Sequence, residues 1–181
     1  MEKKKVLIFT ATYNEVENIK NFLNIVLKLE DLDILIVDDN SPDKTYNIIE
    51  QYKQNYNNLI LIKRDRKLGL DTAHKLGFNF AKENNYEKII TLDADLSHDP
   101  IKIKDFIYEL DFNPFVIGSR YIQGGKNKMK FSRLVLSYFG NKLIKYVLRI
   151  KCDEFTTSFR GFNLKKLKNF DINKVQSKGY S

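Results

Sequence analysis

The segment "ITLDADLSHDP", residues 90–100, places two aspartates one residue apart directly after an apolar run. Such a run is typical of a buried strand. Asp93 and Asp95 stand at positions i and i+2 where this strand ends, so both carboxylates can reach one hard cation, directly or through water. Mg²⁺ and Mn²⁺ prefer oxygen ligands and are commonly completed by substrate phosphates. The pair therefore predicts a divalent-metal site that holds a diphosphate, and an ordinary turn without metal is the alternative.

Polar side chains also follow three other predicted strands, at the point where each strand ends. In chain order they are Tyr13, Asn14, Glu15, Asp38, Asp39, Ser119 and Arg120. Ligands of open α/β sheets bind beyond the carboxyl ends of the strands, so we expect these residues to share one site with the aspartate pair. Two of them have a structural alternative, because Asp38 and Asp39 could instead cap the next helix.

The elements that must position these residues alternate along the chain. Apolar strand patterns cover 5–12, 33–37, 58–64, 88–95 and 115–121, and helical patterns cover 14–30, 46–55, 72–85 and 101–110. Strands that alternate with helices indicate βαβ units and a mostly parallel sheet flanked by helices. The sequence therefore predicts the α/β class.

Several functional classes are disfavoured by what the chain lacks. The first glycine is Gly69, so no glycine-rich phosphate loop follows the first strand, as dinucleotide dehydrogenases and P-loop NTPases require. The two histidines are far apart in the sequence, which argues against a His-rich zinc site. A single cysteine excludes a disulfide framework. No apolar stretch approaches the about 18 to 20 residues of a membrane span, and we interpret the first apolar run as a strand and not as a signal peptide.

Charge is distributed unevenly along the chain. The formal net charge is +8, of which residues 1–119 contribute −4 and residues 120–181 contribute +12. A basic region suits phosphates, an anionic membrane surface or nucleic acid. The pattern of 134–150 fits a basic amphipathic helix, either packed on the core or lying on a membrane surface. Its aromatic residues fall on the apolar face and form no separate platform for bases, so we expect no nucleic-acid partner.

The chain resembles the family 2 glycosyltransferases of GT-A fold, and among them the dolichol-phosphate and polyprenyl-phosphate mannosyltransferases. The matching segments occur in the family order over nearly the whole chain and read "ATYNEVENI", "IVDDNSPDKT", "LGLDTAHKLGF", "LDADLSHDP", "GSRYIQGG", "SRLVLSYFGNKL", "TTSFRGF" and "SKGY". The resemblance implies one GT-A domain over 1–181. Residues 1–119 would be its nucleotide-sugar-binding half and 120–181 its basic acceptor half.

The resemblance also implies roles for individual residues. The nucleotide-sugar donor would be bound by Thr12, Tyr13, Asn14, Glu15, Asp38, Asp39, Asp93, Ala94 and Asp95. Asp93 and Asp95 would hold Mg²⁺ or Mn²⁺, with Ser97 nearby. The acceptor lipid phosphate would be held by Arg120, Arg133 and Ser137, and the catalytic set would be Asp93, Asp95 and Arg120.

The implied reaction is a metal-dependent, inverting transfer of a hexose to polyprenyl or dolichyl phosphate. GDP-mannose is the favoured donor, and UDP-glucose is an alternative. The enzyme would work at the cytoplasmic face of a membrane, attached peripherally. Two alternatives stay open. A related enzyme could transfer sugar from a UDP-sugar to a saccharide hydroxyl, with Asp153 as general base. The chain could also bind a nucleotide sugar without turning it over.

Three places differ from the family pattern. Ala11 stands where the family usually has proline, and Asp71 replaces the second glycine of G-L-G-[ST]-A. Thr157 and Ser158 stand where the family often has a Ser-Gly or Gly-Ser pair. The family also continues past "SKGY" through a segment F-x-x-R-x-x-G-x-S-K, whose arginine helps to bind the donor. We therefore expect this chain to lack the usual C-terminal part.

Overall fold

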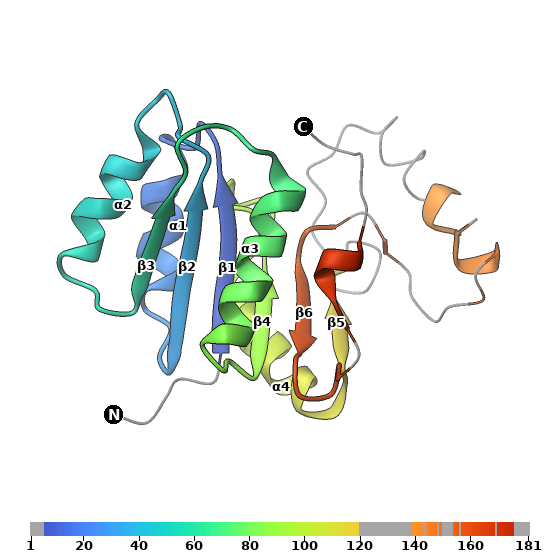
Figure 1. The fold of residues 1–181 in the computed structure, drawn as a ribbon. Coiled ribbons are helices and arrows are strands. Elements are labelled where there is room, and N and C mark those ends of the chain that lie inside the picture. Colours follow the sequence, from blue (N-terminus) through green and yellow to red (C-terminus); the bar gives the residue numbers. More distant parts are fainter. Residues whose placement is uncertain are drawn as a thin grey trace.

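The computed structural model describes residues 6–119 and, between 139 and 175, all positions except 143, 148, 150–153, 156 and 169. One six-stranded sheet, with the order β3-β2-β1-β4-β6-β5, forms the centre of the described part (Figure 1). The predicted acceptor residues Arg120, Arg133 and Ser137, and also Asp153, lie outside the described residues.

The parallel part of the sheet has four strands. They are β1 (Val6–Thr12), β2 (Leu32–Asp38), β3 (Leu59–Lys63) and β4 (Lys88–Thr91). The pairs β1 with β2, β1 with β4 and β2 with β3 are all parallel, so their carboxyl ends lie at one edge. These strands are largely apolar on both faces because both faces are covered by helices.

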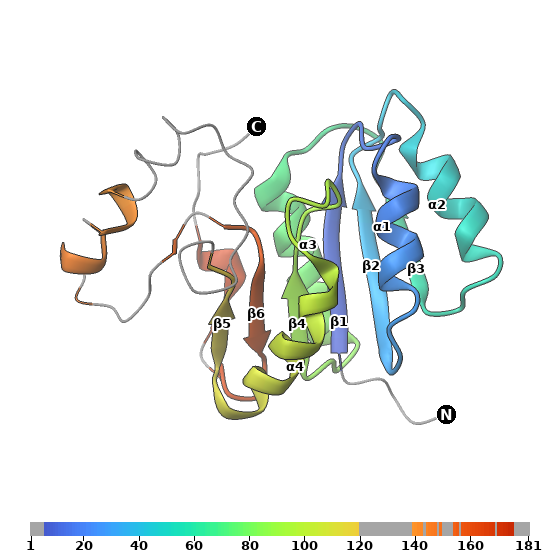
Figure 2. The same cartoon turned by 180° about the vertical axis from the view of Figure 1, so that it is seen from behind.

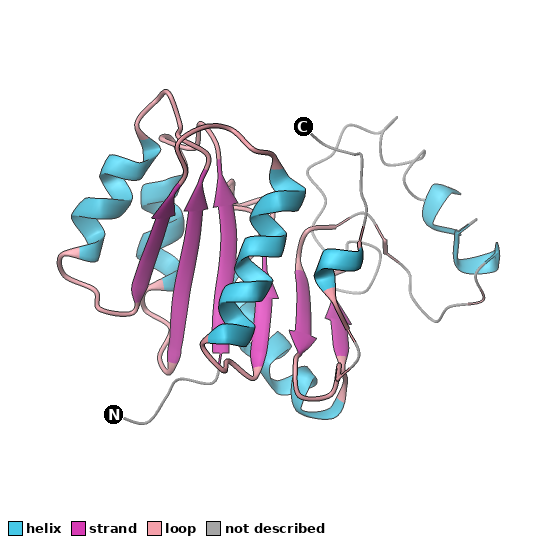
Figure 3. Ribbon diagram, viewed as in Figure 1, coloured by secondary structure: helices cyan, strands magenta, loops and turns pink. Residues whose placement is uncertain are grey.

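Helices cover the two faces unequally. On one face lie α1 (Ile19–Val26), α2 (Thr45–Lys53), the short 3₁₀ helix η1 (Pro100–Lys102) and α4 (Ile103–Phe112) (Figure 2). On the other lie α3 (Leu70–Glu83) and the 3₁₀ helix η2 (Ile172–Lys174) (Figure 3). Alternation along β1 supplies both cores, since Val6 and Ile8 pack with the first set while Leu7 and Phe9 pack with α3. This arrangement confirms the predicted α/β class.

The far side of the sheet differs from the simple βαβ expectation. β5 (Phe115–Ile117) is a strand, as predicted, but it pairs with β6 (Arg160–Asn163), and β6 separates it from β4. Both pairings of β6 are antiparallel. No strand was predicted over 160–163, because a four-residue segment with a central glycine carries little strand signal of its own.

Two further observations bear on the basic part of the chain. Residues 139–142 and 144–147 are helical, which agrees with part of the helix predicted over 134–150. Among the helices of the described residues, none is both long enough and apolar enough to cross a membrane.

Candidate active site

Hydrogen bonds connect two of the loops that carry the predicted strand-end residues at the carboxyl edge of the sheet. The backbone N–H of Asn14 donates to Ser41 Oγ at 3.1 Å, and the backbone N–H of Glu15 donates to Thr45 Oγ1 at 2.9 Å. These bonds join the β1–α1 loop to the β2–α2 loop. Asp93 and Asp95, which follow β4, act electrostatically on Glu15, so the β4 end belongs to the same group.

Each carboxylate of the aspartate pair has one oxygen held by the protein. Asp93 Oδ2 accepts a short hydrogen bond from Ser158 Oγ, and Asp95 Oδ1 accepts one from the backbone N–H of Ser97 at 2.9 Å. Within the described part of the chain, no protein donor contacts Asp93 Oδ1 or Asp95 Oδ2. The Asp93 side chain is 46% exposed. Two partly solvated carboxylates with one free oxygen each fit a hard cation that also takes ligands from a substrate.

The number of protein ligands is small. Among the described residues, no group of three or more His, Cys, Asp or Glu side chains is arranged to hold a metal ion. A site of one or two carboxylates completed by phosphate oxygens is the usual form for Mg²⁺, which keeps several water or substrate ligands. The residues present therefore fit a metal bound together with a diphosphate better than a metal bound by the protein alone.

Glu15 shares the negative environment of the pair. Burial raises the pKa of Glu15 above its usual value, and the charges of Asp95 and Asp93 raise it further, against a hydrogen bond from Asn18 that lowers it. Three carboxylates at one strand edge repel one another, and a divalent cation between them would relieve that repulsion.

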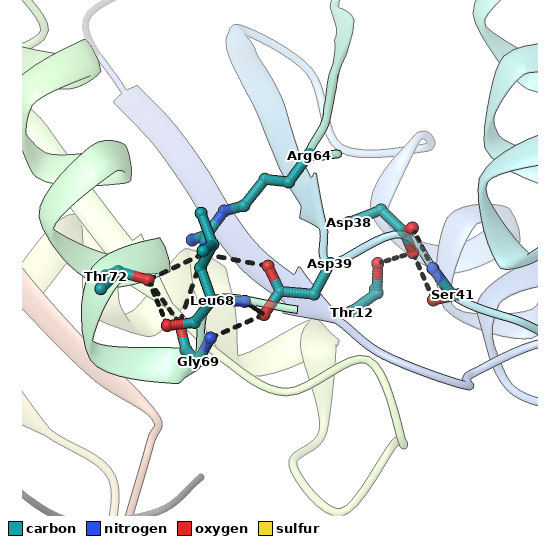
Figure 4. Close-up of polar contacts among 8 residues, drawn as sticks. All are labelled: Thr12, Asp38, Asp39, Ser41, Arg64, Leu68, Gly69 and Thr72. Carbon is teal, nitrogen blue, oxygen red and sulfur yellow. Dashed lines mark hydrogen bonds and ion pairs between the residues drawn. The ribbon is translucent and has the colours of Figure 1, made fainter. Parts of the chain in front are cut away.

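Asp38 faces inward. Its side chain is fully buried, and its oxygens accept three hydrogen bonds, from Thr12 Oγ1 at 2.8 Å, from Ser41 Oγ at 2.6 Å and from the backbone N–H of Ser41 at 2.8 Å (Figure 4). Thr12 is also buried. These bonds give both residues a structural role in fixing the β2–α2 turn, and their predicted contact with a nucleotide stays a prediction.

Asp39 belongs to a separate polar cluster. Its Oδ1 lies 3.0 Å from Arg64 Nη1, and its Oδ2 accepts backbone N–H bonds from Leu68 and Gly69 (Figure 4). Arg64 Nη1 in turn donates to Thr72 Oγ1 at 2.7 Å. Asp39 therefore fixes the loop that leads into α3, and it does so from the strand edge where the site lies.

Arg64 is a residue that the sequence argument missed. It directly follows β3, so the rule applied to the other strand ends would have found it. Two of its donors, Nε and Nη2, are buried and have no hydrogen-bond partner among the described residues.

The remaining residues predicted to bind the nucleotide-sugar donor lie on the β1–α1 and β4–η1 loops. Tyr13 is 37% exposed, and Lys67 Nζ lies 4.2 Å from the centre of its ring, a cation–π contact between two loops at the strand edge. Asn14 is exposed and has a positive φ of 61°, which asparagine tolerates. Ala94 is buried.

Comparison with known proteins agrees with this architecture. The model of the family "Glycosyl transferase family 2" matches residues 7–170. The chain belongs to this family, and the predicted enzyme class, a glycosyltransferase, is confirmed at that level.

Two curated relatives are similar over almost the whole chain. The undecaprenyl-phosphate mannosyltransferase of Micrococcus luteus is 30% identical over 97% of this chain and 73% of its own length. The polyprenol monophosphomannose synthase of Mycolicibacterium smegmatis is 30% identical over 98% of this chain and 68% of its own length. The predicted resemblance to polyprenyl-phosphate mannosyltransferases is thereby confirmed.

A solved structure supports the fold. The mannosyltransferase PcManGT from Pyrobaculum calidifontis, in complex with GDP-Man and Mn²⁺, superposes with a TM-score of 0.60 at 20% sequence identity. The match covers 93% of this chain, which spans about half the length of that protein, namely 48%. This likeness confirms the GT-A fold.

Proposed function

We propose that this chain transfers a hexose from a nucleoside diphosphate sugar to a polyprenyl phosphate, with GDP-mannose as donor and Mg²⁺ or Mn²⁺ as cofactor. The observation that carries the proposal is the pair Asp93 and Asp95 at the carboxyl end of β4, each with one carboxylate oxygen that no donor among the described residues contacts. The names of the two curated relatives support the acceptor and the sugar, and the ligands of the Pyrobaculum protein support the donor and the metal.

In this proposal Asp93 and Asp95 would hold the metal together with the donor diphosphate. When bound there, the metal would supply positive charge to stabilise the leaving nucleoside diphosphate. Tyr13, Asn14 and Glu15 on the β1–α1 loop would line the nucleotide site, and Asp39 with Arg64 would hold the loop before α3. Their role is to orient the donor so that the anomeric carbon is open to attack from the opposite face, which inverts its configuration.

The acceptor half of the proposal concerns the basic part of the chain. A phosphate monoester is already anionic near neutral pH, so the attacking oxygen needs no general base and needs cations that bind it. Arg120, Arg133 and Ser137 are the proposed phosphate ligands, because arginine pairs with phosphate oxygens in a bidentate manner. A lipid acceptor would place the enzyme at a membrane surface, with residues 134–150 as the proposed contact.

The test is transfer of radiolabel from GDP-mannose into an organic-extractable polyprenyl phosphate product, with UDP-glucose as the competing donor. We expect transfer with Mn²⁺ and none with chelator. Asp95→Ala should abolish transfer, because it removes one metal carboxylate, and it should leave the far-UV circular dichroism unchanged since Asp95 is exposed. A fully active Asp95→Ala variant would overturn the metal role.

A further inference from the structure

Two loops that are far apart in the sequence are joined beside the candidate metal carboxylates. The first loop follows β4 and contains Asp93 and His98, and the second precedes β6 and contains Thr157 and Ser158. Ser158 Oγ donates to Asp93 Oδ2, and His98 Nε2 lies 2.9 Å from Thr157 Oγ1. No role in the proposed reaction has so far been given to the second loop.

The second loop is held firmly enough to fix the Ser158 hydroxyl. The Ser158 carbonyl accepts a hydrogen bond of 2.7 Å from Thr91 Oγ1 on β4. Arg160 ties the loop to itself, because its Nε donates to the Thr157 carbonyl at 2.8 Å and its Nη2 donates to the Phe155 carbonyl at 3.0 Å. The Phe159 ring stacks on Phe106 of α4 with centroids 4.0 Å apart.

The hydrogen bond to Asp93 depends on which residue stands at position 158. In the pattern that this segment resembles, a glycine often occupies one position of the pair formed here by Thr157 and Ser158. Glycine has no side-chain donor, so a glycine at 158 could not supply the hydrogen bond to Asp93. The bond belongs to the side chain of this particular residue and not to the backbone of the loop.

We propose that Ser158 is a positioning residue for the metal site, whose hydroxyl holds Asp93 Oδ2 so that Oδ1 is directed to the cation. The inference rests on the proposed function, because it assumes that Asp93 is a metal ligand. Asp93 is 46% exposed and would otherwise rotate among several orientations in solvent. Fixing one oxygen by a charge-assisted hydrogen bond removes that freedom before the metal binds.

The expected loss of metal affinity without the Ser158 hydroxyl is estimated from metal sites in other proteins. Groups that hydrogen-bond to metal ligands orient them, and their removal typically weakens metal binding about 10- to 100-fold. The backbone N–H of Ser97 does the same for Asp95 Oδ1, and no side-chain substitution can remove it. The orientation of Asp93 can be changed in this way, because its Oδ2 is held by the side chain of Ser158, with His98 Nδ1 further away at 3.9 Å.

The experiment measures Mn²⁺ binding to the full chain by water proton relaxation, in the presence of GDP as the diphosphate that completes the metal site. The variants are Ser158→Ala and Ser158→Gly, which lack the hydroxyl, Ser158→Thr, which retains it, and Asp93→Asn, which removes the proposed ligand. Thermal unfolding of each variant controls for folding, and the glycine variant replaces the alanine variant if that chain does not fold.

We expect Ser158→Ala and Ser158→Gly to bind Mn²⁺ about 10-fold or more weakly than the parent, and Ser158→Thr to bind like the parent. The inference alone is overturned if Asp93→Asn loses Mn²⁺ while Ser158→Ala binds it as well as the parent, or more tightly. If the parent binds no Mn²⁺, or binds it independently of Asp93, the proposed metal site and the inference both fail.

Discussion

Asp38 and Asp39 are neighbours in the sequence, yet their carboxylates serve different parts of the structure. Asp38 closes the turn after β2 by accepting bonds from Thr12 and Ser41, whereas Asp39 pairs with Arg64 and holds the loop before α3. Successive residues at a strand end point to opposite sides, which places one aspartate on each side of the sheet. The two adjacent aspartates therefore stabilise two different loops.

Asp38→Ala should destabilise the fold. It leaves the buried donors of Ser41 and Thr12 without an acceptor, and each such group costs about 1–3 kcal/mol. Urea unfolding measures the loss, with Asp65→Ala, a substitution at an exposed aspartate, as the matched control. A variant as stable as the parent that no longer binds nucleotide would contradict the structural role and support the predicted nucleotide contact of Asp38.

His74 gives the structure a dependence on pH. Burial lowers the pKa of His74 to about 4, from an ordinary value of 6.5; Asp93 and Asp71 oppose this shift and Arg160 adds to it. The unfolded chain therefore binds a proton between pH 6.5 and about 4 that the folded chain does not bind, so stability falls as the pH falls through this range.

The expected loss from His74 is about 2 kcal/mol between pH 7 and pH 5. His74→Leu cannot be protonated, so it should remove this part of the slope. Denaturant unfolding of parent and variant at both pH values checks the prediction. Equal slopes in the two proteins would show that His74 is not kept neutral by the fold.

At the scale of elements, the packing of α3 on β1 depends on a close approach. A Cβ atom added at Gly77 would lie 2.4 Å from the Phe9 ring, which is fully enclosed in the core. Gly77→Ala should therefore push α3 away from the sheet and cost about 1–3 kcal/mol.

The matched control for this prediction is Gly140→Ala. Gly140 is also helical, but a Cβ atom there would meet no atom of the described residues within 4 Å. Alanine favours the helix by up to about 1 kcal/mol, so this variant should be as stable as the parent or slightly more stable. Calorimetric unfolding of both variants compares them, and equal stabilities would mean that α3 is free to shift.

The sequence predicted the elements of the parallel part because each has a strong local signal. Apolar strands ended by polar residues located β1 to β4, and the strand-end rule located Asp93 and Asp95. The signal was weaker at boundaries: α1 was expected from residue 14 but begins at Ile19, because the backbone of Asn14 and Glu15 bonds to the neighbouring β2–α2 loop. Such contacts are tertiary and leave no periodicity.

β6 and Ser158 could not be predicted for the same reason. The segment at 160–163 becomes a strand only because β4 and β5 both offer it partners. The Ser158 hydroxyl meets Asp93 across 65 residues of sequence. Arg64 is different, because it is the last residue of the strand pattern 58–64 and its position is therefore visible in the sequence.

At the scale of the whole molecule, the −4 charge of residues 1–119 contrasts with the +12 charge of residues 120–181. In the proposed reaction, the acidic strand edge would bind the metal and the donor diphosphate. The basic region would bind the acceptor phosphate. The described residues place the acidic part at the carboxyl ends of β1 and β4. The assignment of the acceptor role to 120–181 stays a prediction.

The most direct test of the central claim is calorimetric titration of GDP and of UDP into the chain, with Mn²⁺ and with chelator. We expect GDP to bind in the presence of Mn²⁺, to bind far more weakly with chelator, and to lose the metal-dependent part in Asp95→Ala. UDP should bind more weakly than GDP. A folded chain that binds neither nucleotide, or binds GDP equally well with chelator, would contradict a metal-dependent donor site at Asp93 and Asp95.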